Sequence, residues 1–122
     1  MAGGKVVVNL ATGLEDAERV MIAFLVALPA AERGRPVTMF LTKDAVKLAT
    51  TGVAQGVACE GCPPIERLFE QYAAAGGELL VCPICFNARG LDEADLVANA
   101  TIGGATPLWD WIGDDTATVF SY

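Results

Sequence analysis

The 122-residue chain contains no histidine. Histidine is the base of Cys-His dyads and Ser-His-Asp triads and the most common metal ligand, so its absence excludes all of these sites at once. A credible carboxylate pair is missing too, because Glu15/Asp16 and Asp114/Asp115 read as helix-start and turn residues. Hydrolase chemistry therefore has no support in this sequence.

Basic residues are also scarce. The chain has 8 Lys and Arg against 15 Asp and Glu, a formal net charge of −7, and no basic cluster. Neutralisation of phosphates by Lys and Arg supplies most of the affinity of proteins for nucleic acid. We therefore expect no DNA or RNA partner.

Long apolar runs are absent as well. The longest covers residues 20–31, is interrupted by Pro29, and is too short to span a bilayer. The first residues show no basic region followed by an apolar segment and a cleavage site, so no secretory signal is visible. We expect a cytoplasmic protein with no membrane partner, in which four cysteines are more typical of redox, metal or sulfur chemistry than of structural disulfides.

The length corresponds to a single domain covering residues 1–122. Strand-like and helix-like patterns alternate along it, which predicts an α/β fold with a mainly parallel sheet. Strands are expected at 5–10, 37–41, 78–81, 99–102 and 116–122, and helices at 15–33, 44–49, 65–75, directly after Cys82, and at 108–112. The glycine-rich segment 50–64 is the one long irregular stretch, and loops of that length are usually functional or mobile.

The helix expected at 15–33 is unusual because its middle, residues 20–26, is apolar on every face. Such a helix is buried on more than one side. One side can pack on the sheet, and we expect the other to meet a second subunit in a homo-oligomer.

The cysteine turn at residues 79–85, Leu-Leu-Val-Cys-Pro-Ile-Cys, is the main candidate for chemistry. An apolar run suited to a buried strand ends in Cys82, and proline is favoured at the first position of a helix. At a helix N-terminus, free N–H groups and the helix dipole favour the thiolate and lower a thiol pKa. Sites in parallel sheets form beyond the carboxyl ends of the strands, and those ends carry Asn9, Thr12, Thr42, Lys43, Cys82, Cys85, Gly103 and Gly104.

The cysteine spacing by itself leaves three interpretations open. Cys59-x2-Cys62-x19-Cys82-x2-Cys85 fits a four-cysteine zinc site, although a helix and a buried strand lie between the pairs. Cys82 and Cys85 also resemble a thioredoxin-like exchange motif, although here the motif follows the third strand. The simplest alternative is that they are small buried apolar side chains.

Nearly the whole chain resembles the DsrE/DsrF-like family, which includes the TusD-type sulfur-relay proteins. The resemblance lies in the opening strand, the Thr12-Gly13 turn before a long apolar helix, and residues 34–42, Gly-Arg-Pro-Val-Thr-Met-Phe-Leu-Thr. It lies above all in Val81-Cys82 followed by Arg89-Gly90-Leu91. The resemblance implies a three-layer α/β/α fold with a five-stranded parallel sheet, and a trimer or hexamer.

The family resemblance also implies a function. Its sulfur-transferring members carry a cysteine at the position of Cys82, which accepts sulfane sulfur as a persulfide and hands it to a partner protein. Here Cys85 would be a resolving thiol or modulator, and Arg89 either adds positive charge at the turn or is a plain surface arginine. No cofactor is expected in this interpretation, whereas a redox-sensing oligomer or a zinc module with Cys59, Cys62, Cys82 and Cys85 remains the alternative.

Overall fold

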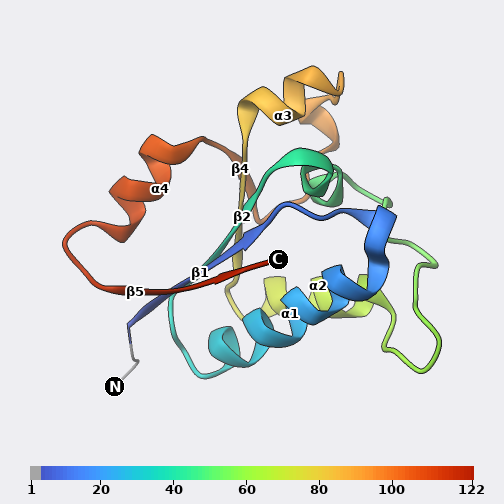
Figure 1. Cartoon of the computed structure of the whole chain (residues 1–122), viewed down its shortest axis with the longest axis horizontal. Coiled ribbons are helices and arrows are strands. Elements are labelled where there is room, and N and C mark those ends of the chain that lie inside the picture. Colours follow the sequence, from blue (N-terminus) through green and yellow to red (C-terminus); the bar gives the residue numbers. More distant parts are fainter. Residues whose placement is uncertain (1–3) are drawn as a thin grey trace.

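The computed structural model describes residues 4–122, and five parallel strands form its one sheet (Figure 1). The strand order is β4-β3-β2-β1-β5. The strands are β1 (Lys5–Leu10), β2 (Val37–Leu41), β3 (Glu78–Val81), β4 (Ala100–Ile102) and β5 (Ala117–Ser121). The expected α/β fold is confirmed, and every strand lies within one or two residues of its predicted position.

The helices are α1 (Ala17–Glu32), α2 (Ile65–Ala74), α3 (Pro83–Ala88) and α4 (Ala105–Ile112), with 3-10 turns η1 (Leu14–Asp16), η2 (Lys43–Ala49) and η3 (Glu93–Asp95). The first helix begins later than predicted, because the Asp16 carboxylate caps α1 by accepting from the Arg19 N–H at 3.1 Å. The last helix begins earlier than predicted, at Ala105, because Pro107 falls in the first turn, where its missing N–H costs nothing.

Helices α1 and α2 cover one face of the sheet (Figure 1). Alternate strand residues such as Val8, Met39 and Val81 point into this layer and are fully buried. The Phe24 ring of α1 stacks on Phe69 of α2 with 4.3 Å between ring centroids. This aromatic contact joins the two helices into one layer over the central strands.

The opposite face of the sheet is covered more thinly, by α4 (Figure 1). The Lys5 ammonium on β1 donates to the carbonyl oxygens of Trp111 and Ile112 at the end of α4, and it lies 5.2 Å from the Trp111 ring centroid. Edge strand β5 remains open, with the Val119 side chain 58% exposed. Helices on both faces of the sheet complete the three layers.

Helix α1 has apolar residues on every side, but its own subunit does not bury all of them. Its inner residues are buried, but Ile22 and Leu25 in the middle of the helix are 41% and 44% exposed. The chain thus leaves part of this apolar surface uncovered. Among residues 4–122, no helix is both long enough and apolar enough to cross a membrane.

Candidate functional site

Cys82 stands at the end of β3, where the strand turns into α3. Its backbone N–H continues the sheet by donating to the Leu41 carbonyl of β2 at 3.0 Å. Its own carbonyl accepts the first helical hydrogen bond, from Phe86 N–H at 3.0 Å, and Pro83 occupies the first helical position. Cys82 is therefore the N-cap residue of α3, as the sequence predicted, at the carboxyl edge of the sheet.

The helix that follows Cys82 is anchored by one aromatic side chain. Phe86 is 1% exposed and belongs to the hydrophobic core, whereas Ile84, on the outer side of the same turn, is 79% exposed. Gly90 closes the helix with a φ of 62°, a conformation that side-chain-bearing residues rarely adopt. The short helix therefore holds Cys82 and Cys85 half-buried at a fixed edge of the molecule.

Both cysteines of this turn are free, and the environment favours the thiolate of Cys82. Burial, the largest single influence, raises the pKa of the Cys82 thiol, but the polar groups of the following turn outweigh it. The backbone N–H groups of Cys85 and Ile84 and the thiol of Cys85 favour the thiolate, so the pKa of Cys82 lies below the ordinary cysteine value. The direction agrees with the expectation from a helix N-terminus.

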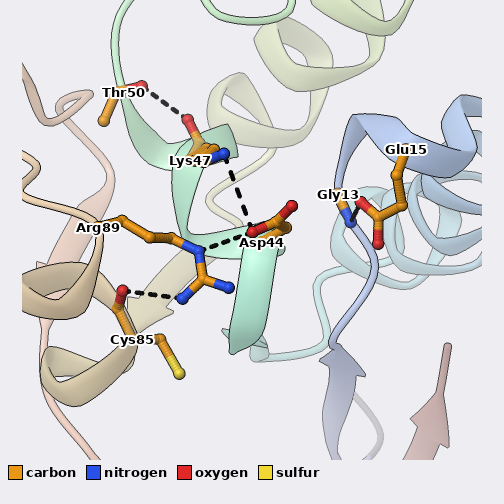
Figure 2. A network of polar contacts seen from close by, with 7 residues as sticks. All are labelled: Gly13, Glu15, Asp44, Lys47, Thr50, Cys85 and Arg89. Carbon is orange, nitrogen blue, oxygen red and sulfur yellow. Dashed lines mark hydrogen bonds and ion pairs between the residues drawn. The ribbon is translucent and has the colours of Figure 1, made fainter.

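Arg89 does not point freely into solvent, nor does it supply an unpaired positive charge to the turn. Its Nε donates to the Asp44 carboxylate of η2 at 2.7 Å, and its Nη1 donates to the Cys85 carbonyl at 3.2 Å (Figure 2). The side chain is 27% exposed. Arg89 is therefore a paired, partly exposed side chain that ties the carbonyl end of α3 to η2.

Asp44 is the centre of a polar clasp that the sequence did not indicate. We define the clasp as Asp44 with its partners Arg89 and Lys47, whose ammonium lies 3.9 Å from the same carboxylate oxygen (Figure 2). The Arg89 hydrogen bond is the main cause that lowers the pKa of Asp44. Asp44 and Arg89 are 45 residues apart in sequence, so only the adjacency of β2 and β3 brings them together.

Two backbone features fix the clasp beside the strand ends. A side chain at Gly13 would place its Cβ 2.7 Å from the Asp44 carbonyl oxygen, so the turn after β1 approaches η2 as closely as only glycine allows. Lys43, directly before Asp44, has a φ of 52°, and no other non-glycine residue within 4–122 has a positive φ. Such strain is often found at functional sites, and here it lies beside the end of β2.

The second cysteine pair lies elsewhere. Cys59 and Cys62 form a disulfide within segment 50–64, with 5.2 Å between their Cα atoms. Within residues 4–122, no group of three or more Cys, Asp or Glu side chains is arranged to hold a metal ion. The structure of residues 4–122 thus does not bring the four cysteines of the zinc alternative together, because Cys59 is bonded to Cys62 while Cys82 and Cys85 are free.

Comparison with known proteins decides the family. A profile of the DsrE/DsrF-like family matches residues 5–120. The chain belongs to the DsrE/DsrF-like family. The resemblance inferred from the Cys82 and Arg89-Gly90 motifs is thereby confirmed.

Individual relatives of this DsrE/DsrF-like protein agree with that assignment. The uncharacterized protein MK0008 of Methanopyrus kandleri is 30% identical over 103 residues, which cover 84% of this chain and 82% of the relative. The uncharacterized protein MJ0760 of Methanocaldococcus jannaschii is 27% identical over 101 residues, covering 83% of this chain and 37% of that longer protein.

Solved structures share the fold. The ychN protein from E. coli superposes with a TM-score of 0.75 at 22% identity and full coverage of both chains. MTH1491 from Methanobacterium thermoautotrophicum, a protein of unknown function, gives a TM-score of 0.70 at 13% identity, covering 98% of this chain and 100% of that chain. These similarities support the three-layer architecture of the family.

The larger cavities of this DsrE/DsrF-like chain do not coincide with the cysteine turn. Cavities of about 440 Å³ and 380 Å³ lie side by side near the start of β3, and both are lined by Ala73, Leu79, Ala98 and Asn99. Cys82 lines neither of them. The half-buried Cys82 thiol therefore lies apart from these two cavities, at the carboxyl end of β3.

Proposed function

We propose that this DsrE/DsrF-like protein is a cytoplasmic sulfur carrier in which Cys82 accepts sulfane sulfur as a persulfide and relays it to a partner protein. The observation that carries the proposal is the free, half-buried Cys82 thiol at the carboxyl end of β3 and the N-cap of α3, a position where its pKa is lowered. Family membership supplies the chemical context.

The loading step follows from the thiolate. The Cys82 thiolate attacks the sulfane sulfur of a donor persulfide, a new S–S bond forms on Cys82, and the donor leaves as its own thiolate. An acceptor thiolate then attacks the outer sulfur, takes it as a persulfide, and releases Cys82 as a thiolate again. The lowered pKa of Cys82 favours its thiolate both as attacking and as leaving group.

Location and assembly belong to the same proposal. We place the carrier in the cytoplasm, where thiols are kept reduced, and assign it a homo-oligomer, a trimer or hexamer. The exposed apolar side chains of Ile22 and Leu25 on α1 support the assembly, because one subunit leaves them uncovered. Partner proteins that donate and accept sulfur would meet the Cys82 edge, with no nucleic acid or membrane involved.

Persulfide loading tests the proposal directly. The purified protein is treated with glutathione persulfide, and native mass spectrometry with peptide mapping locates any added sulfur. At the earliest time points after loading we expect reductant-sensitive sulfur on Cys82 of the wild-type chain, and at no time on Cys82→Ser, which should keep its fold and assembly. Loading that is unchanged in Cys82→Ser would contradict the assignment of this cysteine.

A redox-sensing module is the second candidate, and one observation favours it. Cys59 and Cys62 form a disulfide between residues only 3 apart in sequence, which closes a very short loop. Short loops gain little from a disulfide in the chain-entropy description, so this bond serves stability less than a long-range one would. The two candidates differ in reactivity: a sensor changes its assembly or binding when Cys59–Cys62 is reduced, with no sulfur transfer through Cys82.

A further inference from the structure

The turn that holds Cys82 contains a second free thiol, Cys85, that sulfur relay does not use. Relay needs one cysteine, because donor and acceptor attack in turn at the same sulfur. Cys82 is the N-cap of α3 and Cys85 is the third residue of that helix, two positions whose side chains lie next to each other at a helix N-terminus, and both thiols are half-buried. Arg89 adds a bond to the Cys85 carbonyl, which holds this first turn of α3 in place.

The geometry points to a defined step, which rests on the proposed persulfide function. We propose that the Cys85 thiol resolves a persulfide on Cys82, so that the protein releases the bound sulfur as hydrogen sulfide when no acceptor takes it. Cys85 thereby sets how long the persulfide persists.

The step balances without an outside oxidant. The Cys85 sulfur attacks the inner sulfur of the persulfide, Cys82 Sγ, and a Cys82–Cys85 disulfide bond forms. The bond between Cys82 Sγ and the outer sulfur breaks, and the outer sulfur leaves with the bonding electron pair and takes up the Cys85 thiol proton. The sulfane sulfur is reduced to sulfide while the two cysteines are oxidised to a disulfide, which a dithiol reductant must reduce before the next cycle.

The position of Cys85 selects the inner sulfur as its target. Cys85 belongs to the first turn of the helix that Cys82 caps, so its thiol can reach the inner sulfur, Cys82 Sγ, without leaving the turn. An acceptor protein, by contrast, approaches the outer sulfur from solvent. Relay and release therefore compete through different sulfurs of one persulfide.

The spacing of the pair permits the disulfide product. Cα atoms joined by a disulfide usually lie about 4.4–6.8 Å apart. The other pair of this chain has the same Cys-x-x-Cys spacing, forms a disulfide, and has its Cα atoms 5.2 Å apart. Cys82 and Cys85 have the same spacing and lie within one helical turn, which favours a similar separation.

One loading experiment separates the outcomes. Wild type, Cys85→Ser, Cys82→Ser and the control Cys59→Ser/Cys62→Ser are loaded with one equivalent of glutathione persulfide without air, and sulfide and peptide masses are followed. We expect wild type and the control to release sulfide and gain a Cys82–Cys85 disulfide, whereas Cys85→Ser retains the persulfide on Cys82 and loses the release.

Each contrary outcome has a separate meaning. Sulfide release by Cys85→Ser at the wild-type rate, a lasting Cys82 persulfide in wild type, or added sulfur on Cys85 would overturn the resolving step and leave the carrier function standing. Failure of Cys82 to load even in Cys85→Ser would remove the carrier function and the resolving step together.

A second measurement does not depend on persulfide loading. The Cys59→Ser/Cys62→Ser protein is equilibrated with mixtures of oxidised and reduced dithiothreitol, and the remaining thiols are counted by alkylation. We expect a reversible two-electron transition that joins Cys82 and Cys85. If these two cysteines stay reduced at every ratio, the resolving step is wrong whatever the persulfide result.

Discussion

At the scale of single residues, the reactivity of Cys82 depends on the few atoms around its sulfur. Burial alone would disfavour the thiolate, but the backbone N–H groups of Cys85 and Ile84 and the thiol of Cys85 favour it and lower its pKa. A cysteine in an exposed loop has no such groups fixed beside its sulfur. The pKa of Cys82 is lowered by its own turn of chain, so the effect should survive any change that leaves α3 intact.

The first prediction follows from the sign of that shift. Because the folded pKa of Cys82 is lowered, its alkylation by iodoacetamide should speed up as pH rises through a midpoint below that of an ordinary thiol, and then level off. The stabilising contribution of the thiolate is present above the unfolded pKa and lost as pH falls through the folded one. Peptide mass spectrometry at a series of pH values measures the midpoint.

The protein unfolded in urea is the matched control for this prediction. It lacks the hydrogen bonds of α3, so the midpoint for Cys82 should move upward to that of an ordinary cysteine. A folded midpoint equal to or above the unfolded one would show that burial outweighs the hydrogen bonds.

At the scale of elements, the site depends on how α3 is attached to the body of the protein. The Asp44 clasp joins α3 to η2 at the surface, and Phe86 joins it to the core. The clasp residues are partly exposed, and ion pairs in such positions contribute little to stability. We therefore assign the main attachment of α3 to Phe86 and the orientation of its carbonyl end to Arg89.

The second prediction compares two positions of α3. Phe86→Ala removes a buried ring and should lower the free energy of unfolding by about 3–5 kcal/mol, because it leaves a cavity in the core. Ile84→Ala, on the exposed side of the same helix, should change it by less than about 0.5 kcal/mol. Urea unfolding of both variants measures the difference, and equal effects would mean that α3 is not anchored through Phe86.

At the scale of the whole molecule, the sheet and its helices leave large apolar side chains exposed in several places. Ile22 and Leu25 on α1 form one such surface, and Val119 on β5 belongs to another. Monomeric proteins rarely expose large contiguous apolar patches, and such patches often mark interfaces. The apolar middle of α1 makes the first of these surfaces the expected subunit contact.

The third prediction tests this contact. Leu25→Glu places a charge in the proposed interface and should shift native mass spectra from the oligomer to smaller species, whereas Arg19→Glu, exposed near the start of the same helix, should leave the assembly intact. If Leu25→Glu still assembles and Val119→Glu does not, the contact lies on the β5 side instead.

The sequence predicted most of the fold because local patterns and burial agree in this chain. Apolar runs at β1, β2 and β3 match strands that are covered by helices, and Asp16, Gly34 and Gly90 mark the helix ends as their chemistry suggests. The 3-10 form of η2 escaped prediction, since an apolar pattern does not distinguish a 3-10 turn from an α-helix at this length.

By itself, the sequence determined the strand-to-helix turn at Cys82, because a buried strand, a proline and a cysteine in this order constrain the backbone locally. Only the tertiary structure decided the partners. Arg89 meets Asp44 because parallel pairing places β2 beside β3, and the four cysteines separate into a disulfide and a free pair because segment 50–64 closes on itself. Contacts between distant residues depend on strand order and chain path, which spacing along the sequence does not encode.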